Sequence, residues 1–345
     1  MSTRSGTRGA ADSSASENSI DASAQRGAGS SGQPIAIDYR RAVPAWVREV
    51  IDTHLAIEAE DVRRSGNVGF MARALVNATL PYKDPKTDAF TRVNGDFRLR
   101  IVAGYEGGLP YGIYPRLLLS WISTEAVRRQ SPEIELGESL NAFLRDVLNV
   151  QRGGGARGTS TRVSEQMKRT FGSLITAQYS GSQEHKGFLL KNVLIADEVQ
   201  IDEAEQSGLW TPQQPDVAGT WQSKVRLTRG FYTECVESPV PVDLRAYKAL
   251  RGSPMAMDIY TWLTYRAATG AGRAPIRWEA LQNQFGTTYA FDDQGRRDFK
   301  KAFLKNLKVV NVVYPQAKTQ ILENGLKLLP SKPHVSLATD QKKLF

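Results

Sequence analysis

Two stretches of this 345-residue sequence predict the same succession of secondary-structure elements. In the second stretch the expected elements are, in order, a helix at 255–268, an extended link at 275–277, a helix at 278–285, a turn at 287–294, a helix at about 296–308, a strand at 309–314 and a hairpin of residues 319–322 and 326–329. The hairpin turns at Asn324-Gly325, a dipeptide favoured in two-residue loops. This order is the winged-helix arrangement of the helix-turn-helix class.

The first stretch follows the same order. Its expected elements are a helix at 114–129, a strand at 133–136, a helix at 140–148, a flexible glycine-rich loop at 153–158, a helix from 159 to about 176, and strand at 188–201. Pro115 and Pro132 bound the first of these helices at its start and just past its end. The sequence therefore predicts an α+β fold with tandem winged-helix domains.

The remaining residues frame these two stretches. Residues 1–34 are too poor in large apolar side chains to offset the entropy of ordering, so we expect a disordered N-terminal tail. Residues 44–64 predict an amphipathic helix, 81–96 turns, and 97–102 a strand. The predicted organisation is a disordered tail at 1–34, a helical and strand extension at 35–108 that packs on the first domain, a first winged-helix domain at 109–206, an insertion and junction at 207–242, a second winged-helix domain at 243–335 and a C-terminal tail at 336–345.

The third helix of a helix-turn-helix module buries one face and presents the opposite face to the DNA major groove. In the first stretch one face gathers Val163, Met167, Thr170, Phe171 and Leu174. The opposite face gathers Thr161, Arg162, Glu165, Lys168 and Arg169. Among the polar residues, Thr161, Arg162, Gln166 and Arg169 can read base edges. The candidate DNA contacts here are Arg152, Arg157, Thr161, Arg162, Gln166, Lys168 and Arg169.

The third helix of the second stretch is more basic. Phe299, Phe303, Leu307 and Val310 form its apolar stripe, and Arg297, Lys301, Lys305 and Lys308 lie opposite. Like charges at this spacing cost an isolated helix ~0.2–0.5 kcal/mol per pair, which phosphate contacts would offset. A solvated surface is the ordinary alternative, but the repeated order of elements favours DNA. The candidates are Arg296, Arg297, Lys301, Lys305, Lys308 and Lys318; most are lysines, which favours contacts to phosphate.

The net charge of +9 is unevenly distributed along the chain. Residues 243–345 hold 17 basic and 8 acidic side chains, whereas residues 1–242 hold 28 of each. A second basic concentration, at 145–191, is balanced by acidic flanks. The two basic centres coincide with the two third helices, which favours a polyanionic partner.

The residue types argue against an enzyme, a metal protein or a membrane protein. His54, His185 and His334 share no metal-ligand spacing, and the glycines at 153–155 lack the Lys-Ser/Thr ending of a phosphate-binding loop. The pair at 292–293 lies in the turn before a basic helix, which favours a helix cap over a metal site. The single Cys235 allows neither an internal disulfide nor a thiolate zinc cluster, and no apolar run approaches the roughly 20 residues of a membrane span. We expect no catalytic residues, cofactor or metal, and a cytoplasmic protein in a reducing setting.

Two blocks of sequence resemble the plasmid-encoded RepA replication initiator family. The first runs from Leu109-Pro110-Tyr111-Gly112-Ile113-Tyr114-Pro115-Arg116 through Trp121 to Val127. The second contains Phe231-Tyr232, Pro239-Val240-Pro241-Val242-Asp243-Leu244 and the run from Met257 through Asp258 to Arg266. The resemblance extends over about 81–333 and concerns the scaffold, not the base-reading positions.

This resemblance implies a bacterial protein, associated with plasmid DNA, that binds repeated sites in double-stranded DNA at a plasmid origin, helps to open the duplex and recruits host replication proteins such as a helicase or the bacterial initiator. It also implies repression of the protein's own promoter, often by a homodimer. The alternative is a winged-helix transcriptional repressor without initiator activity, which the sequence alone does not separate from an initiator.

Overall fold

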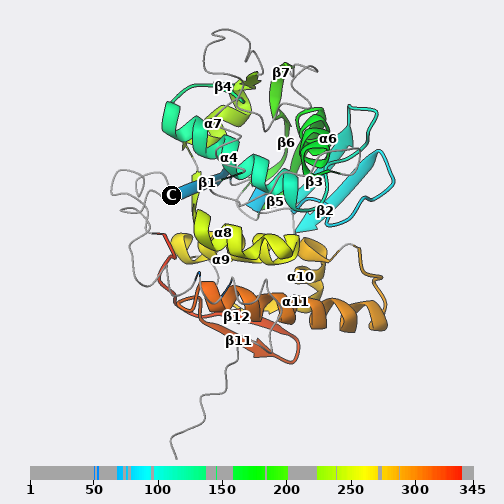
Figure 1. Cartoon of the computed structure of the whole chain (residues 1–345). Helices are drawn as coiled ribbons and strands as arrows, with labels where there is room; N and C mark the ends of the chain where they lie inside the picture. Colours follow the sequence, from blue (N-terminus) through cyan, green and yellow to red (C-terminus); the bar gives the residue numbers. More distant parts are fainter. Residues whose placement is uncertain are drawn as a thin grey trace, which may run out of the picture. The chain divides into compact units, whose positions relative to one another are not determined.

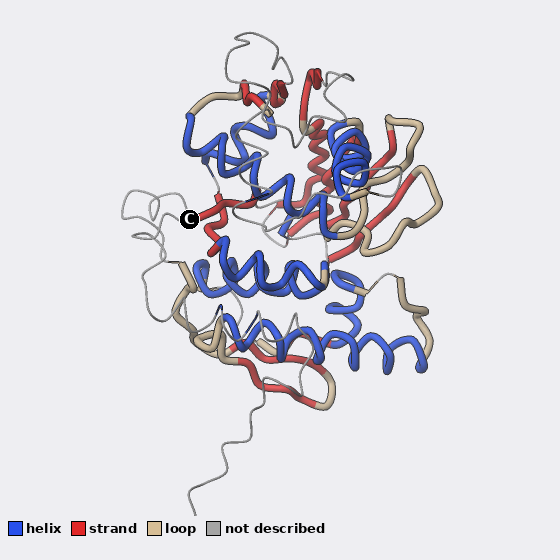
Figure 2. Tube along the Cα trace, in the orientation of Figure 1, coloured by secondary structure: helices blue, strands red, loops and turns tan. Residues whose placement is uncertain are grey.

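The structure is a computed structural model (Figure 1). It describes residues 68–136, 158–200 and 224–335, with gaps at 73–74, 77–78, 95–96, 183–184, 238, 271–273 and 287, and the single positions 50, 53 and 145. All of these belong to one compact unit, Val43–Phe345. We call residues 68–237 the first module and residues 239–335 the second module. Each combines helices and sheet, so the expected α+β class is confirmed at that level (Figure 2).

The first module is built on a four-stranded antiparallel sheet in the order β2-β3-β5-β6. Its strands are β2 (Ala89–Asn94), β3 (Phe97–Ala103), β5 (Ser173–Ser182) and β6 (His185–Leu194). Ile101 faces Ile175 across β3 and β5, and both are buried, as is Leu99 two residues earlier. This alternation along β3 turns one face of the sheet to the core.

Two helices contact each other in the first module, α4 (Ile113–Arg129) and α6 (Thr159–Phe171). The helix α4 confirms the expectation for 114–129, and its buried residues lie on all sides, which identifies a central helix. A second, three-stranded sheet in the order β4-β8-β7 completes the module with α7 (Arg229–Glu237). Its strands are β4 (Glu133–Glu135), β7 (Ala196–Gln200) and β8 (Lys224–Leu227).

A two-stranded antiparallel sheet joins the modules. Its strands are β1 (Val68–Ala72) and β9 (Pro239–Asp243), which pair from Val68 with Asp243 to Ala72 with Pro239. Every residue of β9 is buried. The segment expected only as a junction is therefore part of the core, and its proline residues lie in a sheet with two strands, where lost backbone donors are tolerated.

The second module follows the expected order of elements closely. Its elements are α8 (Leu244–Ala249), the 3-10 helix η3 (Leu250–Gly252), α9 (Pro254–Thr269), β10 (Ile276–Arg277), α10 (Trp278–Phe285), α11 (Asp293–Val313), β11 (Thr319–Leu322) and β12 (Gly325–Leu328). The helices α9 and α11 pack together (Figure 1). Phe303 is the centre of the core between helices, with its ring 5.5 Å from that of Phe285 and 5.6 Å from that of Phe299.

Two expected boundaries of the third helices are wrong. Residues 309–313 are the last turns of α11 and not a strand, because Val310 and Val313 continue the buried stripe of that helix. This packing overrides the strand preference of a valine-rich run. The helix expected to reach about 176 ends at Phe171, and β5 begins at Ser173. Gly172 lies between them and its N–H caps the carbonyl of Lys168.

The strands also differ in part from the prediction. The expectation of turns at 81–96 misses β2, and the strand expected over 188–201 is two strands, β6 and β7, in different sheets. The expected hairpin is present, but Leu322 pairs with Gly325, so the turn falls at Glu323 and Asn324. The expectations for 1–34, 153–157, 210–221 and 336–345, and nearly all of the helices expected at 44–64 and 140–148, lie outside the described residues.

Candidate nucleic-acid interface

The helix α11 separates a buried stripe from a basic one. Phe299, Phe303 and Leu307 are at most 2% exposed, whereas the side chains on the opposite side are exposed. The exposed cations of this helix are Arg296, Arg297, Lys301, Lys305 and Lys308. The structure thus places the basic residues predicted for the third helix of the second stretch on the exposed side of α11. The apolar residues predicted for that helix lie in the core.

These cations differ in the ion pairs and hydrogen bonds that they make. Arg296 lies 3.4 Å from Asp293 and 3.8 Å from Glu279, and Arg297 donates to the side-chain oxygen of Gln294 at 2.9 Å. Within the described part of the chain no ion pair or hydrogen bond is made by the ammonium groups of Lys301, Lys305 or Lys308. Three lysines are therefore free to contact a partner.

The turn before α11 fixes the start of this helix. Asp292 caps it by accepting the N–H of Gly295 at 2.7 Å, as the expected cap requires. The carbonyl of Ala290 accepts from the side chain of Gln282 at 2.8 Å and lies directly against Gly295, where a Cβ would overlap it. Only glycine lets the turn approach the helix this closely.

The β11–β12 hairpin is attached to the same helix. Lys300 places its ammonium 4.9 Å from the ring centre of Trp278 and donates to the carbonyl of Glu323 in the hairpin turn at 3.3 Å. The indole N–H of Trp278 donates to that carbonyl as well, at 3.0 Å. Lys318, just before β11, is exposed. The hairpin therefore keeps a fixed position beside the basic stripe.

The helix α6 buries the residues that its periodicity predicts. Val163, Met167, Thr170 and Phe171 are at most 4% exposed. Leu174 does not continue this stripe, because it lies in β5 and is 36% exposed. Thr161 and Arg162 are exposed and Lys168 is partly exposed. Arg152 and Arg157 lie outside the described residues.

Gln166 and Arg169 do not share this accessible surface. Gln166 is 4% exposed, and its side-chain oxygen accepts the N–H of Tyr111 at 2.9 Å. Arg169 donates from Nε to Glu165 at 2.8 Å, and its guanidinium lies 5.3 Å from the ring centre of Tyr111. The expectation that both read bases needs correction, since both side chains attach α6 to the loop before α4. A helical wheel cannot show that this loop covers part of the predicted surface.

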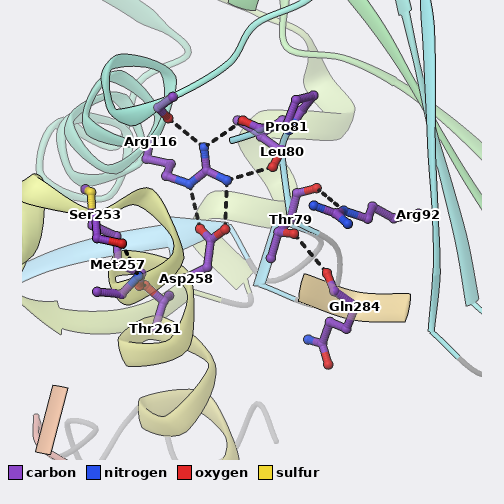
Figure 3. Close-up of polar contacts among 12 residues, drawn as sticks. Thr79, Leu80, Pro81, Arg92, Arg116, Ser253, Met257, Asp258, Thr261 and Gln284 are labelled. Atoms are coloured by element: carbon purple, nitrogen blue, oxygen red, sulfur yellow. Dashed lines mark hydrogen bonds and ion pairs between the residues drawn. The ribbon is translucent and has the colours of Figure 1, made fainter. Parts of the chain in front are cut away.

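A cluster of buried polar contacts that was not predicted from the sequence connects the two modules (Figure 3). Arg116 in α4 and Asp258 in α9 form a bidentate ion pair, with both N···O distances 2.7 Å. Their side chains are 3% and 10% exposed. Thr79 donates to the carbonyl of Gln284 in α10 at 2.9 Å. Arg116 is the one charged residue among residues 113–124, and Asp258 the one among residues 254–265, but neither position indicates its partner.

Burial shapes the electrostatics of this cluster. Burial alone would lower the pKa of Arg116, but the Asp258 carboxylate stabilises the guanidinium and raises its pKa. Arg92 in β2 lies 4.9 Å from the ring centre of Phe90, and burial lowers its pKa to about 10. Two arginines and one aspartate thus share the buried boundary of the modules.

The described residues hold neither a candidate metal cluster nor a candidate membrane span. No group of three His, Cys, Asp or Glu side chains in them could hold a metal ion. Of the helices in these ranges, none has the length and apolar character of a membrane span. Cys235 is buried in α7, and burial raises its pKa to about 12.

The described residues thus define a mixed helix-and-sheet protein with two modules, each of which exposes basic residues on a helix opposite a buried stripe. Residues 109–278 match the family model described as "Plasmid encoded RepA protein". The match supports the RepA-type replication initiator family for this part of the chain, as the two sequence blocks predict.

Two solved structures match the chain at low sequence identity. A selenomethionine derivative of domains 2 and 3 of RctB matches with 10% identity and a TM-score of 0.40, covering 70% of this chain and 83% of that chain. A second structure of RctB domains 2–3 matches with 9% identity and a TM-score of 0.41, covering 74% and 94%. No curated protein matches the chain.

Proposed function

We propose that this protein initiates plasmid replication by binding repeated sites in double-stranded DNA at the origin through two winged-helix modules. One observation carries the proposal: Lys301, Lys305 and Lys308 are exposed in a line on α11 and make no ion pair within the described residues. Such a line of like charges costs free energy unless a polyanion neutralises it.

The order of elements in the second module supports the winged-helix assignment. The strand β10 follows α9 and pairs with β12, so it forms one sheet with the β11–β12 hairpin. The turn between α10 and α11 is the position of the turn in a helix-turn-helix motif. In the first module, α4, β4, α6 and the β5–β6 hairpin follow one another along the chain. The helix expected between β4 and α6 lies outside the described residues, and β4 pairs with β8 in a different sheet from the hairpin.

The two helices would contribute differently. In this proposal α11 contacts phosphates and supplies most of the affinity. The contacting residues are Arg296, Arg297, Lys301, Lys305 and Lys308, together with the nearby Lys318. Thr161 and Arg162 are the exposed residues of α6 with side chains suited to base edges, and in this proposal Lys168 contacts the DNA backbone.

The wider role is proposed from the match to the family model. The protein would act in the bacterial cytoplasm on plasmid DNA, open the origin, recruit host replication proteins, and repress its own promoter as a homodimer. We propose no catalytic activity and no cofactor. Hydrolysis of ATP or nicking of supercoiled plasmid by the purified protein would contradict this.

A footprint of the purified protein on its own replicon tests the DNA-binding proposal. We expect protection of tandem repeats beside an AT-rich tract, and we expect a plasmid that lacks the gene to replicate only when the protein is supplied in trans. Protection of a single promoter palindrome, together with replication in the absence of the gene, would identify a transcriptional repressor instead.

A further inference from the structure

The Arg116 side chain uses its whole hydrogen-bonding capacity at the boundary between the modules. Its Nε and Nη2 donate to the two carboxylate oxygens of Asp258. Its remaining N–H groups donate to the carbonyls of Leu80, at 2.7 Å, Pro81, at 3.3 Å, and Gly112, at 2.6 Å. All five guanidinium N–H groups therefore have acceptors, and the arrangement permits one orientation of α9 against α4 (Figure 3).

A second contact prevents rotation about this pair. Thr79 donates to the carbonyl of Gln284, and the Gln284 side chain donates to the carbonyl of Val76 at 3.4 Å. The carbonyl of Thr79 in turn accepts from Arg92 in β2 at 3.2 Å. Both α9 and α10 are thus tied to the segment that leads into the sheet of the first module.

These contacts form a continuous connection between the two basic helices. On one side α11 packs on α9, which carries Asp258. On the other side Arg116 binds Gly112, next to Tyr111, whose N–H is held by Gln166 of α6. A displacement at the ion pair would therefore change the position of α6 relative to α11.

Stability alone does not explain a buried pair of this kind. The desolvation of two charges offsets much of their attraction, so a buried ion pair is weak evidence for a gain in stability over apolar packing. What such a pair enforces is geometry, because the planar guanidinium accepts a carboxylate in few orientations.

We propose that the Arg116–Asp258 pair is a positioning element that fixes the separation of α6 and α11 and thereby selects DNA sites by the spacing of their two contact regions. This inference rests on the proposed function. Inserting one base pair between the contact regions moves one of them by ~3.4 Å along the duplex and rotates it by ~34°. A rigid pair of modules tolerates such a change poorly, whereas a loosened pair adjusts to it.

The test measures the affinity of the full chain for a panel of duplexes with one to five base pairs inserted or removed between the two footprinted regions. We expect the wild type to lose about tenfold in affinity for one inserted base pair, and Asp258→Asn to lose less than about threefold. Asparagine keeps the shape of aspartate, but its amino group faces the guanidinium and breaks the bidentate pair.

Asp243→Asn is the matched control. Asp243 is also a buried carboxylate, but its partner Arg245 lies two residues away and within the second module, at 2.8 Å. Asparagine also remains able to cap α8. We expect this variant to keep the spacing profile of the wild type, so that a change in Asp258→Asn reports the boundary and not a general loss of stability.

The outcomes separate the inference from the proposed function. Circular dichroism first establishes that each variant is folded; if Asp258→Asn is not, Arg116→Lys takes its place, since it keeps the charge and loses the fork. A folded variant that retains the tenfold penalty overturns the inference, as does a wild type that binds all spacings equally. A wild type that protects no DNA in the footprint overturns the proposed function.

Discussion

The side-chain oxygen of Gln166 in α6 accepts a hydrogen bond from the backbone N–H of Tyr111, 2.9 Å away and 55 residues earlier in the chain. Two further hydrogen bonds join α6 to the segment before α4. Arg169 donates to the carbonyl of Leu109, and the Tyr105 hydroxyl donates to Glu165 at 3.3 Å. The loop that precedes α4 thus holds one side of α6. What remains most accessible on α6 is its N-terminal turn, with Thr161 and Arg162, while Lys168 is partly exposed.

Gln166→Ala should therefore act on stability and not on base preference. The substitution leaves the N–H of Tyr111 without its acceptor, which costs about 1–3 kcal/mol in the free energy of unfolding. Urea denaturation measures this loss, and binding to a set of single-base variants of the site measures preference. A relaxed preference at unchanged stability would return Gln166 to the base-reading surface.

Charge reversal of Lys301 and Lys305 should weaken binding to every DNA sequence. Each phosphate contact contributes ~0.9 to the slope of log K against log salt concentration, so the double variant should flatten the slope by about two. Titrations at several salt concentrations give the slope. Lys224→Glu, a reversal at an exposed lysine of β8, is the control and should leave the slope unchanged. A slope that stays at the wild-type value in the double variant would remove α11 from the interface.

Arg162→Ala should lower affinity selectively. Arg162 is exposed at the start of α6, and an arginine that binds a guanine edge contributes ~1–3 kcal/mol of discrimination. We expect a loss of this size on the origin site, a smaller loss on random DNA, and a stability within about 0.5 kcal/mol of the wild type, as is usual at the surface. Equal losses on both DNAs would indicate a phosphate contact.

Local signals in the sequence were sufficient for much of the fold. Apolar residues at helical spacing between two prolines predicted α4 to within a residue, and Asn324-Gly325 predicted the β11–β12 hairpin with its turn one residue late. The buried and exposed sides of α11 also followed from periodicity, because one side of this helix packs on the core and the opposite side is exposed to solvent.

The errors arise where distant segments decide the outcome. The strand β2 carries a weak local signal and exists because it pairs with β3, and residues 309–313 stay helical because α11 continues to pack through Val310 and Val313. The same reason explains Gln166: its side chain is of a type that can read bases, but the loop that binds it comes from 55 residues away. The pairing of Arg116 with Asp258, 142 residues apart, has no local signature.

A pair of glycine substitutions tests the turn before α11. In Gly295→Ala the new methyl group would overlap the carbonyl of Ala290, so the turn or the helix must shift, at a cost of about 1–3 kcal/mol. In Gly230→Ala, in α7, the methyl group meets nothing within 4 Å, and the lower entropy of the unfolded chain should stabilise the protein by about 0.4–1 kcal/mol. Thermal or urea unfolding gives both values. Equal stability of the two variants would show that the turn is not packed as described.

Cys235 provides a test of the core of the first module. It is the chain's only cysteine, it is buried in α7, and its thiol donates to Ser123 of α4 at 3.5 Å. Because burial raises its pKa to about 12, only ~1 thiol in 10⁴ is ionised at pH 8, and the thiolate is the reactive form. A disulfide reagent should therefore modify the native protein slowly, because the contact between α7 and α4 must open first. In guanidinium it should modify the unfolded protein rapidly, at one thiol per chain. Raising the pH from 7 to 9 increases the thiolate fraction of both states, but the native state should remain the slower one throughout. Rapid modification of the native protein at pH 8 would mean that α7 does not pack on α4 as described.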